Sequence, residues 1–513
     1  MDRLLEAHGW RYVVLVVCVY GVSQGAGEGL MYFAQQYWLT DTLELSPSKF
    51  AEVDAITSIP WQIKSLYGIA SDVLPMFGYH RTPYMVGTSL IGLVAFAGLW
   101  KMDLALGVGG TTWLLFWANL SIAAPDVMVD ASVAQKSSIN PALASDLQAL
   151  CWASFGVFKI ASLLVVPTIM QRLGVRVVFG VAMVTSVAVT VPSLLGWMGE
   201  ERKQDEPSMG LITKLGEFCT NANSGPFVRL SLLLTGMSLA MGVVAMFMPH
   251  YAIAAFALLV VTPVIACLVY VYESKVNVTL AKFSLYIFLS GAIQPSSPVL
   301  FYWMKQDDFN CALDLPCFSP DFISTISVVG YVTFVVATLT YNRYLTGVSY
   351  RKIYAATQFG LFALNLLDLV WVNRWNKTVF AVSDKAFVLG DEVISPMISR
   401  WNVMPMLILA SQLCPTGVEA TFFAMTMGLS NFGGTLGEYF GVGLMEWFGL
   451  GAHQYDQLGE FVIARSLCRL LPLLLIPLLL PQGSPDTLAH TAVPPAEEHE
   501  TIPLQQQVGK YST

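Results

Sequence analysis

The chain has 513 residues, of which 55% are hydrophobic and only 12% are charged. Ordinary soluble domains carry about 25% charged residues, so this composition, with a mean hydropathy of +0.60, excludes a soluble globular protein. The formal net charge of −8 comes without a basic patch, which argues against nucleic-acid binding.

Apolar runs of about 20 residues follow one another along the chain, each long enough for a transmembrane helix. Because backbone polar groups must be satisfied inside a bilayer, runs of this length favour helices over barrel strands. We predict an all-α polytopic membrane protein with about 12–14 spans. The predicted spans are 12–38, 50–71, 84–104, 111–135, 146–169, 174–198, 227–248, 251–273, 279–304, 321–344, 352–372, 384–413, 417–448 and 459–481.

The short loops between the spans predict the orientation of the chain. Lys and Arg are moderately enriched on one side, which places both termini in the cytoplasm. This topology puts the sequon at Asn376 outside, as a candidate glycosylation site. Cys311 and Cys317 share a polar loop, and they would form a disulfide if that loop faces an oxidising space.

The first and ninth spans share a sequence pattern, which indicates an internal repeat. Each has a glutamine followed at the same offsets by apolar or aromatic residues: Gln24, Leu30, Tyr32 and Phe33, and Gln294, Leu300, Tyr302 and Trp303. A Ser-Pro pair, Ser46-Pro47 or Ser319-Pro320, then opens the next helix. Chance similarity between apolar helices is the alternative. The predicted regions are an N-terminal six-helix bundle (1–198), a cytoplasmic linker (199–226), an inserted helix pair (227–278), a C-terminal six-helix bundle (279–481) and a disordered cytoplasmic tail (482–513).

Charged residues inside apolar spans are the candidate site residues, because a charge in a bilayer is costly. Glu28 follows Gln24 by one turn on the first helix, beside glycines at four-residue spacing that permit close helix contact. Asp54 and Lys159 lie deep in the second and fifth spans, where they would pair with each other, with Glu28 or with substrate. The ninth span breaks at residues 294–298, which points to a cavity or to a simple packing kink.

Two carboxylates on the fourth span, Asp126 and Asp130, are one turn apart and share a face. They predict a proton-exchange site, or alternatively an ion pair with Lys136, Lys64 or Arg81. In the second half, Asp391 and Glu392 precede Arg400 on one helix, and Arg465 and Arg469 are one turn apart in the last span. An inward-facing arginine would suit an anionic substrate, whereas the alternative is snorkelling to the membrane interface.

The chain contains no Walker loop, no HExxH motif and no Cys/His metal spacing. We therefore expect a protein that is not an enzyme and that needs no cofactor or metal.

The block Lys64–Asp72, together with residues 75–81, resembles the signature of the folate–biopterin transporter family of the major facilitator superfamily. Residues 126–134, residues 384–391 and residues 413–421 are also similar to that family. The resemblance implies a major facilitator-type fold and a cytoplasmic ion-pair latch with Asp72 and Arg81 as candidates. Three positions depart from the pattern near the gate: Ser65, His80 and Gln135.

The resemblance implies a secondary transporter of folate or biopterin-like pterins that works by alternating access and is coupled to protons. The alternatives are a carrier of another organic solute, such as S-adenosylmethionine, and a non-transporting receptor or scaffold. We expect a monomer in the plasma membrane rather than in an organelle. The expected substrate-binding residues are Gln24, Glu28, Asp54, Lys159, Gln294, Asp391, Arg400 and Arg469. The expected coupling and gating residues are Lys64, Asp72, Arg81, Asp126, Asp130 and Glu419.

Overall fold

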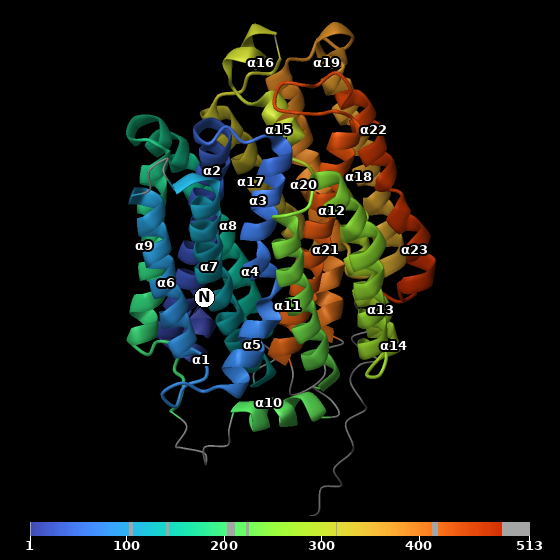
Figure 1. Ribbon diagram of the computed structural model, residues 1–513. Helices are drawn as coiled ribbons and strands as arrows, with labels where there is room; N and C mark the ends of the chain where they lie inside the picture. The colour runs from blue at the N-terminus through green and yellow to red at the C-terminus, as the bar shows by residue number, and fades with distance from the viewer. Residues whose placement is uncertain are drawn as a thin grey trace, which may run out of the picture.

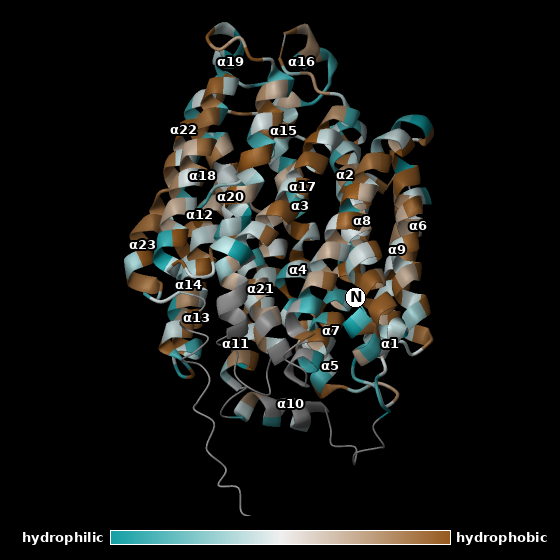
Figure 2. Cartoon of the chain, turned by 180° about the vertical axis from the view of Figure 1, so that it is seen from behind, coloured by the Kyte–Doolittle hydropathy of each residue, from teal (hydrophilic) through white to brown (hydrophobic). Residues whose placement is uncertain are grey.

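The computed structural model describes residues 2–101, 106–139, 143–202, 211–221, 225–313, 315–412 and 419–484. These residues form a bundle of helices that run broadly along one axis (Figure 1). Within them, ten helices are long and apolar enough to cross a membrane. Apolar residues cover the flanks of helices such as α9 and α22 (Figure 2), as lipid contact requires.

The helices match the predicted spans, although several spans are broken into two or more pieces. The first part of the chain forms α1 (Asp2–Val16), η1 (Val17–Ala26), α2 (Gly27–Tyr37), η2 (Trp38–Thr42), α3 (Pro47–Thr57), α4 (Ile59–Gln62), α5 (Lys64–Val73), α6 (Thr82–Lys101), α7 (Gly107–Ile139), α8 (Ala144–Leu173) and α9 (Val175–Leu194). The middle part forms α10 (Leu211–Thr220), α11 (Gly225–Ala245), α12 (His250–Phe256), η5 (Ala257–Val261) and α13 (Thr262–Glu273).

The last part forms α14 (Val278–Ala292), α15 (Val299–Met304), α16 (Asp308–Ala312), α17 (Pro320–Tyr344), α18 (Tyr350–Val372), α19 (Trp375–Thr378), α20 (Asp384–Gln412), α21 (Glu419–Trp447), α22 (Leu458–Cys468) and α23 (Leu471–Leu479). The predicted tail lies outside the described residues from position 485 onwards. Helices α16 and α19 lie at one end of the bundle and α10 at the other, and we call these the α16 end and the α10 end (Figure 1).

The first helix departs from its predicted bounds, because it begins at Asp2 rather than at residue 12. Half of its first ten residues are charged or histidine, so hydropathy detects only the apolar continuation. The helix bends at Gly9, whose φ of 75° disfavours any residue with a Cβ. It then widens into the π-helical segment η1, a form that is frequent at functional sites.

The repeated Ser-Pro pairs act as predicted, since each opens a helix. Ser46 Oγ accepts a hydrogen bond from the backbone N–H of Lys49 at the start of α3. Ser319 Oγ accepts one from the backbone N–H of Phe322 at the start of α17. The proline follows at the first helical position, where its missing N–H costs nothing.

Two groups of helix contacts join the first and last parts of the bundle. Helix α8 packs against α17, and α21 packs against α3, α4 and α5. Helices α11, α12 and α13, which contain the segment predicted as an insertion, lie against α21 and α14, beside the second of these contacts. The inserted helices therefore cover one side of the junction between the halves.

The apolar cores differ between the two ends. At the α16 end one cluster contains residues of both halves, among them Phe33, Leu115, Tyr302 and Phe461. Towards the α10 end the apolar side chains divide, with one cluster built mainly around α1, η1 and α7 and another around α14 and α18. The two halves thus share a continuous apolar seal at the α16 end.

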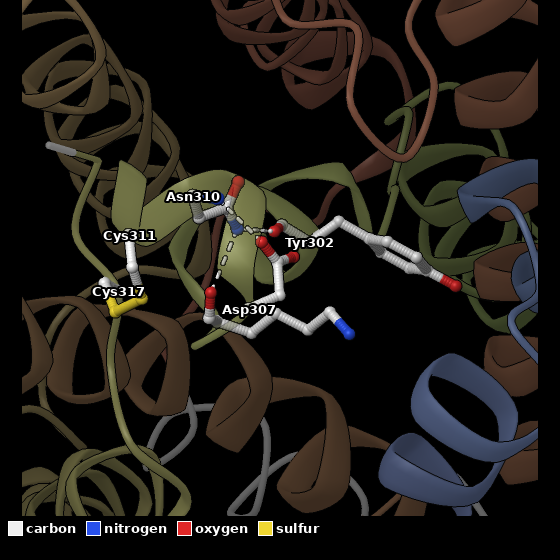
Figure 3. Close-up of a disulfide and its surroundings, with 6 residues drawn as sticks. Tyr302, Asp307, Asn310, Cys311 and Cys317 are labelled. Atoms are coloured by element: carbon white, nitrogen blue, oxygen red, sulfur yellow. Dashed lines mark hydrogen bonds between the residues drawn. A yellow bond between two sulfur atoms is a disulfide. The ribbon is translucent and has the colours of Figure 1, made fainter. Parts of the chain in front are cut away.

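The segment that follows α15 holds a disulfide between Cys311 of α16 and Cys317 (Figure 3). Its neighbour Asn310 fixes the loop, because its Nδ2 donates to the carbonyl oxygens of Tyr302 and Lys305 at 2.8 and 2.9 Å. The predicted glycosylation site, Asn376, is not accessible in the structure. Asn376 is fully buried, and its Nδ2 donates to Asp384 Oδ1 at 2.9 Å, which argues against a glycan on that nitrogen.

Candidate functional site

A polar cavity of about 430 Å³ lies between the two halves. Glu28 of α2 and Trp61 of α4 line it from the first half, and Asn431 and Glu438 of α21 line it from the second. Its volume falls within the range of small-molecule sites, which is about 300–1,000 Å³. Ordinary membrane helices pack without such a space, so this cavity is the candidate site.

Glu28 and Lys159 form an ion pair in which Lys159 Nζ lies 3.2 Å from Glu28 Oε2. The ammonium also lies 5.1 Å from the centre of the Tyr331 ring on α17. Of the partners considered for Lys159, the structure selects Glu28. The lysine therefore stands behind the cavity wall and holds the carboxylate that lines the cavity.

The predicted close approach of the first helix to its neighbour is confirmed at the glycines. A Cβ on Gly25 would lie 2.5 Å from the carbonyl oxygen of Phe155 on α8, and one on Gly29 would lie 1.9 Å from Ser162 Oγ. Only glycine permits this spacing, and it is the spacing that brings Glu28 within reach of Lys159. Gln24 is buried one turn before Glu28.

Asp54 has a different partner from any considered in the sequence. Its Oδ1 accepts a hydrogen bond from Gln35 Nε2 at 2.9 Å. Its electrostatic neighbour is Glu438 of α21, and Tyr32 lies close to both carboxylates. Glu438 Oε2 is buried without a hydrogen-bond partner among the described residues. Two carboxylates from opposite halves therefore interact electrostatically, and of the two only Glu438 is among the residues that line the cavity.

Glu438 was missed in the sequence, although the signal was available. It stands in an apolar helix, like Glu28, and the cost of a charge in a bilayer applies equally to both. Residues of α21 near Glu438 form hydrogen bonds with α4 across the junction of the halves. Asn431 Nδ2 donates to the carbonyl oxygen of Trp61 at 2.9 Å, and Gln62 Nε2 donates to Thr435 Oγ1 at 2.9 Å.

The carboxylates of the fourth span separate into two environments on α7. Lys64 Nζ lies 2.6 Å from Asp126 Oδ2, and both side chains are more than 90% buried. Asp130 instead accepts a hydrogen bond from the Tyr20 hydroxyl of η1. The ion-pair alternative is therefore present at Asp126, whereas Asp130 faces a neutral donor.

A second cavity, of about 170 Å³, lies within the second half. Gln294 lines it at the break after α14, and Arg469 lines it at the break between α22 and α23. Arg469 Nη1 donates to Gln294 Oε1 at 2.5 Å. The two cavities share one lining residue, Ser430 of α21. The break at residues 294–298 thus borders a cavity, as the polar sequence there suggested.

Asp391 and Arg400 lie on the same helix but have separate partners. Asp391 Oδ1 accepts a hydrogen bond from Ser395 at 2.7 Å. The Arg400 Nε donates to Thr338 at 3.0 Å, and the guanidinium lies over the rings of Trp152 and Phe334. Arg465 forms an ion pair of 2.5 Å with Asp368. Neither Asp391 nor Arg400 is among the residues that line the two cavities.

The expected latch at the α10 end has different bonds from those predicted. Arg81 Nη1 donates to Gln135 Oε1 at 3.0 Å, and among the described residues no ion pair joins it to Asp72. The Glu200 carboxylate binds this segment instead, accepting from the backbone N–H groups of Arg81 and Thr82 at 3.0 Å each. Glu419 begins α21, and its side chain lies outside the described part of the chain.

A histidine of the inserted helices joins both halves near the α16 end. His250, the first residue of α12, has Nε2 at 3.1 Å from Glu52 of α3 and Nδ1 at 2.9 Å from Glu446 of α21. Lys49 Nζ also lies 2.6 Å from Glu52. Since a carboxylate only accepts hydrogen bonds, both ring nitrogens must donate, which requires the protonated imidazolium.

The sequence matches the model of the BT1 family over residues 24–493. A "Probable folate-biopterin transporter 2" of Arabidopsis thaliana is 30% identical over 495 residues, which cover 94% of this chain and 85% of the relative. A "Folate-biopterin transporter" of Synechocystis is 27% identical over 495 residues, which cover 92% of this chain and 86% of the relative.

Two solved transport proteins have a similar arrangement of helices. A POT-family peptide transporter matches with a TM-score of 0.59 at 13% identity, over 91% of this chain and 96% of that one. A nucleoside transporter matches with a TM-score of 0.57 at 11% identity, over 91% of this chain and 98% of that one. At this identity the likeness concerns the fold alone.

Proposed function

This chain belongs to the BT1 family, and on that basis we propose that it is a secondary transporter of folate and biopterin-like pterins. Its fold is of the major facilitator type, with several membrane-spanning helices, and it is a transport protein rather than an enzyme. Transport proceeds by alternating access, in which the two halves expose a shared site first to one side of the membrane and then to the other.

The observation that carries the proposal is the acid-lined cavity between the halves. Glu28 and Glu438 contribute carboxylates from opposite halves, and Trp61 contributes an aromatic ring. A pterin ring is flat, and one edge carries guanidine-like N–H donors that a carboxylate binds through paired hydrogen bonds. A tryptophan face suits stacking on such a ring. The rival reading of a non-transporting scaffold predicts a dry interior, which this cavity does not support.

The seal at the α16 end supports alternating access. One apolar cluster there contains side chains of both halves. Polar contacts join the halves in the same region: Lys305 Nζ lies 2.5 Å from Asp41 Oδ1, and the Tyr302 hydroxyl donates to the carbonyl oxygen of Leu45 at 2.5 Å. We propose that these contacts must open when the cavity is exposed to the α16 side.

Proton coupling, orientation and assembly are further parts of the proposal. Asp130 is the proposed coupling residue, because it lies one turn from the buried Lys64–Asp126 pair and its hydrogen bond comes from the neutral hydroxyl of Tyr20. We propose that both termini are cytoplasmic, that the α16 end faces outside, and that the protein acts as a monomer in the plasma membrane. Replacing Asp130 by Asn should then abolish the pH dependence of uptake.

The test is uptake of labelled folate and labelled biopterin into vesicles that contain the purified protein, with an imposed pH gradient. Glu28→Gln removes one of the two carboxylates that line the cavity and should raise the apparent KM for both substrates. The matched control is Glu460→Gln, which changes an exposed carboxylate of α22 and should leave uptake unchanged. Uptake at background in wild-type vesicles would refute the transport of these substrates. An apparent KM unaltered by Glu28→Gln would refute the contact between Glu28 and the substrate.

A further inference from the structure

The cavity within the second half is too small to hold a complete substrate. Its volume is about 170 Å³, below the 300–1,000 Å³ that is usual for whole ligands. It shares the lining residue Ser430 with the larger cavity between the halves, so the two cavities adjoin at that residue. The small cavity therefore suits one end of a substrate.

The wall of this cavity contains a guanidinium without an acidic partner. Arg469 is bonded to a neutral amide, Gln294, and among the described residues no carboxylate forms an ion pair with it. Arg465, one turn before it, is another cation, and the charge of Arg465 is balanced by Asp368. A buried cation of this kind is stabilised when an anion binds to it.

The remaining polar groups of the cavity are neutral. Gln294 Nε2 donates to Gln358 Oε1 at 3.3 Å, which fixes both amides, and Ser399 and Asn402 add a hydroxyl and an amide. All residues that line this cavity lack a negative charge. Arginine binds a carboxylate through two parallel N–H···O bonds, a geometry that lysine and neutral donors do not reproduce.

We propose that this cavity is a subsite for a carboxylate of the substrate and that Arg469 is the residue that recognises it. The inference rests on the proposed function and adds the orientation of the substrate in the site. The donor-rich pterin ring lies against Glu28 and Glu438 in the central cavity, and an acidic tail extends past Ser430 to Arg469. Folate has such a glutamate tail and biopterin does not, so Arg469 distinguishes the two substrates.

The experiment compares labelled folate and labelled biopterin in vesicles that contain Arg469→Gln, wild-type protein or the control Arg172→Gln. Arg172 is exposed at the end of α8. Loss of a hydrogen-bonded charge contact should raise the apparent KM for folate roughly tenfold to a hundredfold. The apparent KM for biopterin should stay unchanged, which also shows that the variant is folded.

A second variant covers the case in which Arg469→Gln does not fold. Gln294→Glu keeps the arginine and places a carboxylate beside it, so that the internal ion pair competes with the substrate. It should likewise reduce folate uptake and spare biopterin uptake.

Two results would overturn the subsite, and a third would overturn the transport function on which it rests. An equal loss for both substrates would show a role in holding the helix break. An unchanged KM for folate would show that no carboxylate binds there. Uptake of neither substrate by the wild type would refute the transport function itself, and that result differs from failure of the subsite alone.

Discussion

The buried pair of Lys64 and Asp126 gives the clearest quantitative prediction. The charged atoms are 2.6 Å apart, and the side chains are only 9% and 4% exposed. Lys64→Met removes the ammonium and keeps most of the apolar stem, so Asp126 is left as a buried charge without a cation. Breaking a buried pair from one side costs about 3–5 kcal/mol.

Two features of the site explain why the expected loss of stability is within about 3–5 kcal/mol rather than below that range. Asp130 is a second carboxylate one turn away, so the charge of Asp126 gains no help from its own helix. Lys64 Nζ also lies 4.5 Å from the centre of the Trp61 ring, a contact that is lost as well. A loss of about 3–5 kcal/mol corresponds to roughly a 10²- to 10⁴-fold change in the folding equilibrium.

The assay is reversible unfolding of purified protein in mixed detergent micelles. Lys101→Met, at the exposed end of α6, is the control and should be close to wild type. The double variant Lys64→Met with Asp126→Leu should recover most of the lost stability, because replacing both partners removes the unpaired charge. A single variant within about 0.5 kcal/mol of wild type, the range of ordinary surface changes, would refute this reasoning.

Two further predictions concern a helix break within the second half and a charged bridge between the halves. A Cβ on Gly441 would lie 1.7 Å from the carbonyl oxygen of Ser296, so Gly441→Ala should displace α21 from the break after α14 and reduce uptake strongly. The control Gly236→Ala, with open space around the new methyl group, should not reduce uptake. Equal uptake by the two variants would contradict the close contact. The bridge from His250 to Glu52 and Glu446 exists only while the imidazole is protonated, with Lys49 as the other charge at Glu52. The stabilisation by this bridge is therefore present at low pH and lost as the pH rises through the titration of His250. Thermal unfolding of the wild type and of His250→Gln between pH 5 and pH 9 should show a difference in stability that disappears at high pH. A difference that stays constant with pH would show that the charge is unimportant.

Much of the candidate site could be found from single residues in the sequence. Glu28 and Gln294 stood out because a charged group or a proline break in an apolar run is costly unless it borders a cavity or a partner. Both do line cavities in the structure. The same rule applied to Glu438 would have found it too. The family signature at Lys64–Asp72 was also readable, since it consists of neighbouring residues.

The sequence by itself determined that the chain is a membrane protein, where its spans lie and which repeated Ser-Pro pairs open helices. These features depend on local hydropathy and on backbone chemistry, which act over a few residues. Only the tertiary structure decided that Lys159 pairs with Glu28, that Lys64 pairs with Asp126, and that Glu438 lies beside Asp54. Each of these pairs joins residues that are far apart in the chain. The sequence contains several residues of suitable charge for each buried group, so residue type alone does not identify the partner. The packing of the helices, set by small residues such as Gly25 and Gly29, brings one partner within reach and excludes the others.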